Sequence, residues 1–272
     1  MPPLIAPAEL LGPPLFEWLA LAMGLVVGSF ANVCIHRLPR HESVVVPPSS
    51  CPTCGARIRA RDNVPVLGWL LLRGFCRSCR TPISMRYPAI EALNGLLYWF
   101  LAATRGASAA SFVAMGLATV LLVLSLVDLD HHLLPDAITL PGIVAGCLAS
   151  LVRQPPGPLE AALSAAFGYL GMAALARAAE WYYGEEALGQ GDWKMIAMLG
   201  AFLGARPTLA ALFLATAAGA TLGLFMIVIG RGSRRMRLPL GTFLGWGGLG
   251  VLLAGDGLLA LYDRFFLFVV RV

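Results

Sequence analysis

The chain has 272 residues, of which 58% are hydrophobic and only 13% are charged. Soluble domains have about a quarter of their residues charged, so this composition excludes an ordinary water-soluble protein, because its polar side chains are too few to cover a surface exposed to water. The formal net charge is +5, but the basic residues lie between apolar segments rather than along one face. This placement favours membrane orientation over nucleic-acid binding.

The apolar residues form segments of the length that predicts transmembrane helices, since about 17–25 mainly apolar residues cross a bilayer. Met1 to Glu17 has no basic region and no small-residue cleavage site, so we expect the first segment to stay as a membrane helix rather than to be removed as a signal peptide. The expected fold class is all-α, a polytopic membrane helix bundle of about eight transmembrane segments. The segment from Met195 is short and could instead be a buried half-helix. The predicted segments are Phe16–Ile35, Ala89–Thr104, Ala107–Val127, Ala137–Val152, Ala161–Tyr183, Met195–Gly204, Thr208–Gly230 and Leu240–Leu261.

The distribution of Lys and Arg predicts which loops are cytoplasmic, because these residues accumulate on that side. The stretch after the first segment has nine arginines, and every second loop after it has zero, two and four basic residues, whereas the intervening loops have one each. We therefore expect the first long loop to be cytoplasmic and both chain ends to lie outside. The turns that contain Asp128 and Asp192 follow the third and fifth segments, so the same reasoning places both on the cytoplasmic side.

The first long loop, Arg37 to Tyr87, is too short for a hydrophobic core of its own. It carries two C-x2-C pairs, separated by residues 55–75, and this spacing is close to that of zinc ribbons. Four thiolates complete a tetrahedral structural zinc site; reduced thiols and two disulfides are the alternatives, and a cytoplasmic location disfavours disulfides. We expect three parts: a first transmembrane segment (1–36), a cytoplasmic zinc-binding domain (37–87) and a transmembrane domain (88–272). The predicted zinc ligands are Cys51, Cys54, Cys76 and Cys79.

Two aspartates lie where a charge is costly, which makes each a candidate for function. Asp128 follows an apolar segment directly, and Asp192 follows two glycines in Gly189-Gln-Gly-Asp192. Glycine allows close backbone approach, so such a carboxylate could point into a packed bundle. Two neighbouring carboxylates share a proton. The ionised one can take a proton from water that attacks a peptide carbonyl, while the protonated one polarises that carbonyl and later protonates the leaving amine.

The neighbouring polar residues have simpler interpretations. Asp136 follows a proline and precedes an apolar run, so we expect it to cap a helix N-terminus. Asp130, His131 and His132 are expected to be solvated, although Asp130 could support the site. Lys194 is interpreted as an interfacial residue whose long side chain reaches the membrane surface.

Several motifs together resemble the type IV prepilin peptidases, also called prepilin leader peptidase/N-methyltransferases. Each is weak alone, whereas their order along most of the chain, from about Gly28 to Gly245, is specific. The chain departs from this pattern at Leu238-Pro-Leu-Gly-Thr-Phe243, which lacks the phenylalanine and the second proline of the family's late proline-phenylalanine-glycine-proline element. The motifs are the Gly28–Pro39 segment, the two C-x2-C pairs, Arg86-Tyr-Pro-Ala-Ile-Glu91, Asp128-x-Asp-x5-Asp136 and Gly189-x-Gly-Asp192-x-Lys194.

The resemblance implies a bifunctional enzyme of the bacterial inner membrane. Such an enzyme cleaves the short basic leader of type IV prepilins and type II secretion pseudopilins after a glycine, on the cytoplasmic side, and then methylates the new N-terminal residue from S-adenosylmethionine. It implies that Asp128 and Asp192 are catalytic and that the four cysteines hold one zinc. The acidic residues around the site, Glu185 and Glu186 among them, are expected to attract the basic leader. We assign no residue to S-adenosylmethionine.

Two other functions are compatible with parts of the pattern. An ion-coupled transporter could use Asp128 and Asp192 as a proton relay, although transporters place such sites near the membrane midplane, in broken helices. A zinc-bearing scaffold would not need an aspartate pair. The predicted partners of the enzyme are prepilins or pseudopilins and the lipid bilayer, without nucleic acid; the sequence predicts no oligomeric state.

Overall fold

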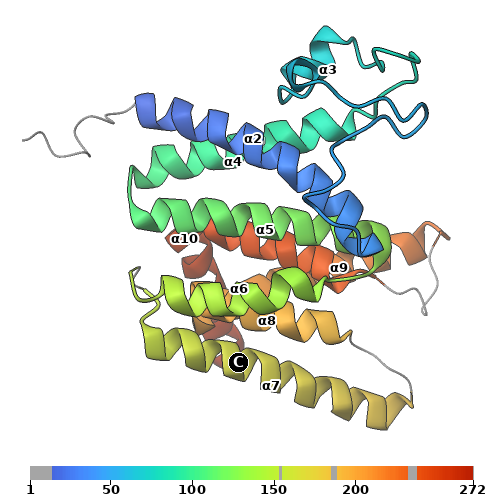
Figure 1. Ribbon diagram of the computed structural model, residues 1–272. Helices are drawn as coiled ribbons and strands as arrows, with labels where there is room; N and C mark the ends of the chain where they lie inside the picture. Colours follow the sequence, from blue (N-terminus) through green and yellow to red (C-terminus); the bar gives the residue numbers. More distant parts are fainter. Residues whose placement is uncertain (1–13, 153–154, 185–188, 232–237, 272) are drawn as a thin grey trace, which may run out of the picture. The chain divides into compact units, whose positions relative to one another are not determined.

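The computed structural model describes residues 14–152, 155–184, 189–231 and 238–271, with the side chains of Tyr183, Asp256 and residues 265–271 excepted. The chain divides into two compact units, one through Thr119 and one from Val120 onward. Within the described ranges the regular structure is helical, with two isolated β-bridges, so the all-α prediction is confirmed (Figure 1). Glu185 and Glu186, expected to attract the leader, lie outside these ranges. The helices are α2 (Leu15–Arg37), α3 (Leu67–Leu71), α4 (Arg86–Arg105), α5 (Ala109–His131), α6 (Asp136–Ala149), α7 (Pro158–Tyr183), α8 (Gln190–Leu203), α9 (Ala205–Val228) and α10 (Leu240–Arg271), with the 3-10 helices η1 (Leu38–Arg40) and η2 (Ala60–Asp62).

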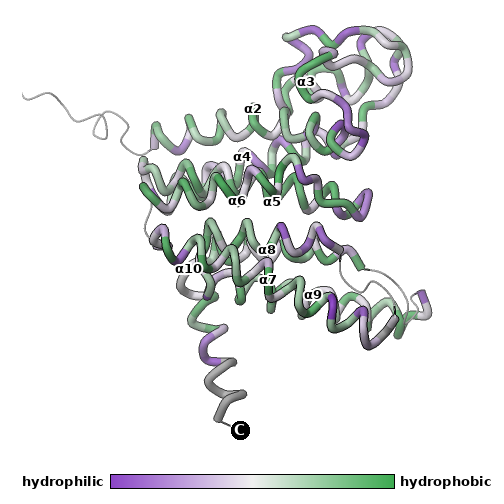
Figure 2. The backbone as a smooth tube through the Cα atoms, turned by 60° about the horizontal axis from the view of Figure 1, so that its bottom comes forward, coloured by the Kyte–Doolittle hydropathy of each residue, from purple (hydrophilic) through white to green (hydrophobic). Residues whose placement is uncertain are grey.

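Each predicted apolar segment overlaps one of these helices, but the number of spans is not confirmed as eight. By length and apolar character, four helices in the described residues can cross a membrane: α2, with η1, and α5, α7 and α9. The two parts of α10, Leu240–Gly255 and Gly257–Arg264, meet at 110° and would make a fifth span if they count as one. The protein is therefore a multi-pass membrane protein. Figure 2 shows the hydrophobic residues that predominate along the helices and the more hydrophilic loop around α3.

In the first unit, α2 packs along α4 through small residues and one polar network. A Cβ atom at Gly28 would lie 2.8 Å from the Cα of Glu91 on α4, so the two backbones approach too closely for a side chain there. The fully buried Asn94 donates to the Gly24 carbonyl at 2.7 Å and accepts from the Thr119 hydroxyl at 2.8 Å. Since a buried amide is costly unless hydrogen-bonded, this network fixes how α2, α4 and the start of α5 meet.

In the second unit, α8 is the central element and contacts α6, α7, α9 and α10. Its residues from Met195 to Ala201 are all buried, which explains why the apolar part of this 14-residue helix can be too short to cross a membrane. Within this unit the end of α5 and the starts of α6 and α8 lie at the same end of the helices (Figure 1). The residues that follow Val127 and Gly189 in the sequence are therefore brought to one place.

The approach of α10 to the end of α5 depends on glycines of α10. Gly245 is buried, and a Cβ atom there would overlap the Ser125 hydroxyl and lie 3.1 Å from the Leu121 carbonyl oxygen. Gly250 lies one and a half turns further along α10, and nothing lies within 4 Å of a Cβ atom built there. The two glycines are thus sterically different, although they share one helix.

We predict that Gly245→Ala lowers the free energy of unfolding by about 1–3 kcal/mol, because overpacking forces helices apart. Gly250→Ala is the matched control, and we expect it to be neutral or to stabilise by up to about 1 kcal/mol through helix propensity. Thermal unfolding of both variants in detergent compares them. Equal effects of the two substitutions would contradict the close approach at Gly245.

Candidate active site and metal centre

Asp128 lies in the last turn of α5, and its side chain is turned into the second unit rather than toward solvent. Only 5% of the residue is exposed. Its Oδ2 atom accepts hydrogen bonds from the Thr242 backbone N–H at 2.6 Å and lies 3.0 Å from the Thr242 hydroxyl oxygen. The same hydroxyl lies 3.1 Å from the Ser125 carbonyl oxygen. Sequence reasoning did not identify Thr242, which lies 114 residues away in the chain.

A glycine beside Thr242 allows this contact to form. A Cβ atom at Gly241 would lie 3.0 Å from Cγ of Asp128 and 2.8 Å from Cδ1 of Leu134. Any other residue would therefore push the start of α10 away from the carboxylate. The signal in the sequence was the glycine that directly precedes Thr242.

Asp192 lies in the first turn of α8, a helix that is not among the candidate spans. Gly191 packs against Leu134, because a Cβ atom at Gly191 would lie 2.8 Å from the Leu134 Cβ. Leu134 therefore packs against Gly191, which directly precedes Asp192, and against Gly241, which lies beside the Asp128 carboxylate. Burial and the negative charge of Asp128 raise the pKa of Asp192 to about 7. The two predicted aspartates are thus brought together, while their catalytic role stays a prediction.

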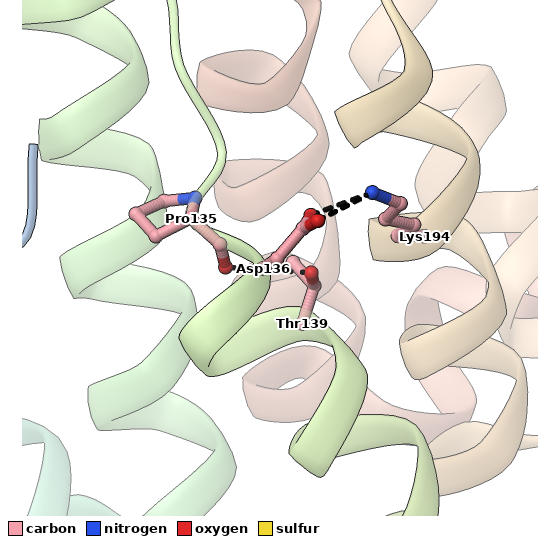
Figure 3. A network of polar contacts seen from close by, with 4 residues as sticks. All are labelled: Pro135, Asp136, Thr139 and Lys194. Carbon is pink, nitrogen blue, oxygen red and sulfur yellow. Dashed lines mark hydrogen bonds and ion pairs between the residues drawn. The ribbon is translucent and has the colours of Figure 1, made fainter.

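An ion pair joins the starts of α6 and α8 beside the aspartates (Figure 3). Lys194 donates to both carboxylate oxygens of Asp136, at 2.6 and 2.8 Å. The capping interpretation of Asp136 is wrong: it is the first residue of α6, Pro135 precedes it as N-cap, and no side-chain cap hydrogen bond forms. The carboxylate instead pairs with Lys194, and its position in the first turn also suits the helix dipole. The other residues of this segment, Asp130, His131 and His132, are exposed.

The four predicted metal ligands form one cluster in the first unit. The Sγ atoms of Cys51, Cys54, Cys76 and Cys79 all lie within 4.8 Å of one another, and all four cysteines are free thiols rather than disulfides. A set of four sulfur ligands at this separation fits a tetrahedral metal ion such as zinc. The cluster can therefore hold a metal ion.

The two cysteine pairs have the same backbone geometry. The N–H of Cys51 donates to the Ala56 carbonyl, and its carbonyl accepts from Gly55; the N–H of Cys76 likewise donates to Thr81, and its carbonyl accepts from Arg80. Gly55 and Arg80 both have left-handed φ angles, of 69° and 60°. Two equivalent turns thus present two thiols each, which is how paired knuckles bind one ion.

The rest of the loop supports this arrangement through polar contacts. Arg77 pairs with Asp62 through two hydrogen bonds, at 2.8 and 2.5 Å. The indole N–H of Trp69 donates to the Ile83 carbonyl at 3.0 Å, which joins two parts of the loop. Glu91 of α4 accepts a hydrogen bond from the Val66 N–H at 2.7 Å, which connects the loop to α4.

Comparison with known families gives two matches in chain order. Residues 22–105 match the bacterial peptidase A24 N-terminal domain, and residues 115–224 match the type IV leader peptidase family. The first match contains the cysteine cluster, and the second contains Asp128 and Asp192. No solved structure is significantly similar to the chain.

The chain is also similar to curated proteins named prepilin leader peptidase/N-methyltransferase. It is 40% identical to that of Myxococcus xanthus over 215 residues, which are 79% of this chain and 64% of the relative. It is 38% identical to that of Burkholderia pseudomallei over 87% of this chain and 84% of the relative. It is 36% identical to that of Aeromonas hydrophila over 94% of this chain and 96% of the relative. The two matching family models and these similarities, which cover 79–94% of the chain, together show that the chain belongs to the type IV leader peptidase family.

Proposed function

We propose that this chain is a prepilin leader peptidase/N-methyltransferase that cleaves the basic leader of type IV prepilins and type II secretion pseudopilins after a glycine. The observation that carries the proposal is that Asp128, in the last turn of α5, and Asp192, in the first turn of α8, lie at the same end of the second unit (Figure 1), where Leu134 packs against both Gly191 and Gly241. Burial and the charge of Asp128 also raise the pKa of Asp192. A pair of this kind is suited to peptide hydrolysis, because it holds one proton between two acids. The relatives' names supply the substrate class.

In the proposed reaction, one carboxylate is ionised and the other protonated. The ionised one takes a proton from a water molecule as the water oxygen bonds to the peptide carbonyl carbon, and the protonated one hydrogen-bonds to the carbonyl oxygen. The peptide C–N bond then breaks as the leaving nitrogen receives a proton. An active site of this kind accelerates the reaction because both proton-carrying groups are already in position before the reaction starts.

The location of the site supports cleavage at a membrane surface rather than within the bilayer centre. Asp128 is three residues before His131, the last residue of α5, and Asp192 is in the first turn of α8. Both therefore lie near helix ends, and the arginine-rich loop of residues 37–87 supports placing such ends in the cytoplasm. On this proposal, 37–87 is a cytoplasmic zinc-binding domain and 88–272 is the peptidase domain, in the inner membrane. The zinc would hold two loop turns together as a structural ion.

Methyl transfer from S-adenosylmethionine is the second proposed activity. It is supported by the names of the relatives, and no residue of this chain is assigned to the cofactor. An ion-coupled transporter is not favoured, because relatives along most of the chain are named as peptidases and the aspartates lie near helix ends rather than in the middle of a span.

The aspartate pair is tested by conservative amides. We expect Asp128→Asn and Asp192→Asn each to lower the rate of leader cleavage at least about a hundredfold, because each removes a proton carrier, while membrane insertion is retained. Asp130→Asn is the matched control and should retain measurable activity, since Asp130 is exposed on the same helix; Asp136→Asn should also retain measurable activity. A gel-shift assay of prepilin processing gives the readout. Normal cleavage by Asp192→Asn would rule out the pair.

The raised pKa of Asp192 predicts a cost in stability that depends on pH. An unfolded aspartate has a pKa near 3.9, so ionising Asp192 in the folded protein costs free energy that grows with pH up to about 7 and is constant above it. We expect Asp192→Asn to unfold a few degrees above wild type at pH 8, and by less at pH 5.

Thermal unfolding of wild type and Asp192→Asn in detergent at both pH values measures this effect. A variant that unfolds below wild type at pH 8 would contradict the electrostatic cost, because the amide carries no charge to desolvate.

The metal centre is tested by its content. Freshly purified, reduced protein should contain about one zinc per chain by elemental analysis. Cys51→Ser or Cys79→Ser should lower that content. Either variant should also make the loop more susceptible to protease, because a short loop without a core depends on metal for its folding free energy. Cys147→Ser removes a thiol outside the cluster and should leave the zinc content unchanged. Protein free of zinc would remove the assignment.

A further inference from the structure

Thr242 offers Asp128 two hydrogen-bond donors of different kinds. The backbone N–H, 2.6 Å from Oδ2, is always a donor, whereas the hydroxyl carries one proton that can point to Oδ2 at 3.0 Å or to the Ser125 carbonyl at 3.1 Å. All three residues are buried. Because water has little access here, these contacts are stronger than they would be at the surface.

The geometry around Oδ2 suits an ionised carboxylate. A carboxyl group protonated on Oδ1 could still accept at Oδ2, but hydrogen bonds to an ionised carboxylate are stronger, so the two donors of Thr242 stabilise the charged form more than the neutral one. If Asp128 becomes protonated, the Thr242 hydroxyl has the Ser125 carbonyl as an alternative acceptor. The contact therefore favours the charged state of Asp128 without making protonation impossible.

Asp192 lies in a less favourable environment for a charge. Burial and the charge of Asp128 oppose its ionisation, and the backbone of Gly189, which favours ionisation, has a smaller effect than either. Of the two carboxylates, Asp192 is therefore the one that the surroundings keep protonated near neutral pH.

We propose that Thr242 is a positioning residue that holds Asp128 ionised, so that Asp128 acts as the base and Asp192 as the acid in leader cleavage. This inference rests on the proposed function of the aspartate pair. Thr242 contacts Asp128 rather than the reacting atoms, so it acts through that carboxylate. Gly241 is what lets the Thr242 backbone reach it.

The proton transfers in this assignment balance. Asp128 takes a proton from water as the water oxygen bonds to the carbonyl carbon, and Asp192 gives its proton to the carbonyl oxygen. When the C–N bond breaks, Asp128 passes its proton to the leaving nitrogen, and the hydroxyl proton of the former carbonyl oxygen returns to Asp192. The products are an acid and an amine, and the pair is restored to its starting state.

The experiment compares pH profiles of leader cleavage for wild type, Thr242→Val, Thr242→Ala, Thr242→Ser and Thr208→Val. Thr242→Val is nearly isosteric and removes only the hydroxyl, and Thr242→Ala removes it with less bulk. Thr208→Val is the matched control, because the hydroxyl of this buried threonine donates to the Gly204 carbonyl. Asp128→Asn is included as a reference for the aspartate pair.

We expect Thr242→Val and Thr242→Ala to lower kcat by roughly ten- to a hundredfold, since a hydrogen bond to a charged group is lost, with KM little changed. Loss of the Thr242 hydroxyl makes ionisation of Asp128 less favourable, so the acidic limb of the kcat/KM profile should move about one unit to higher pH. Thr242→Ser keeps both donors and should retain the wild-type limb, as should Thr208→Val.

Two results would overturn the inference about Thr242: an acidic limb that does not move in either hydroxyl-free variant, or a Thr242→Ser variant that behaves like Thr242→Val. Rapid cleavage by Asp128→Asn would be a different result, because it would refute the aspartate pair itself. The two failures are thus distinguished by which variant departs from expectation.

Discussion

Asp128 and Asp192 lie at the same end of the second unit, and keeping both of them ionised in this buried site costs free energy. Like charges in a poorly hydrated site cannot both be ionised cheaply, so the proton of one is retained. In this chain the effect is expressed at Asp192, where burial and the charge of Asp128 raise the pKa to about 7. A group with that pKa can hold or release a proton near neutral pH, which is the property that a general acid needs. The structure thus keeps an unfavourable charge arrangement that chemistry can use.

Small residues make the arrangement sterically possible. Gly241 lets α10 reach Asp128, and Gly191 lets the start of α8 pack on Leu134. The Lys194–Asp136 ion pair joins the starts of α8 and α6 at the same end of the unit. Since Lys194 is two residues from Asp192, the pair restrains the segment that carries this aspartate.

The sequence predicted those parts of the molecule that depend on local pattern. The long apolar segments form helices, and the two C-x2-C pairs form one sulfur cluster. Both features could be predicted because the length of an apolar segment and the spacing within each cysteine pair are visible in the local sequence. Contacts between distant segments were not predictable in this way. Gly241 marks a close approach, but nothing in the sequence indicates that the partner of Thr242 is Asp128, 114 residues away. The pairing of Asp136 with Lys194 likewise joins residues 58 apart. The number of spans was also not predictable, since the apolar segment from Met195 onward is buried by neighbouring helices.

The central claim is that one proton is shared by Asp128 and Asp192 and resides on Asp192. Infrared difference spectroscopy of the purified protein, titrated from acidic to alkaline pH, can follow the carbonyl stretch of a protonated carboxyl group. The account predicts a signal lost with a midpoint near pH 7 in wild type. That signal should be absent in Asp192→Asn, and it should have a lower midpoint in Asp128→Asn, because the neighbouring charge has been removed. A midpoint that is unchanged in Asp128→Asn, or a signal that persists in Asp192→Asn, would contradict the account.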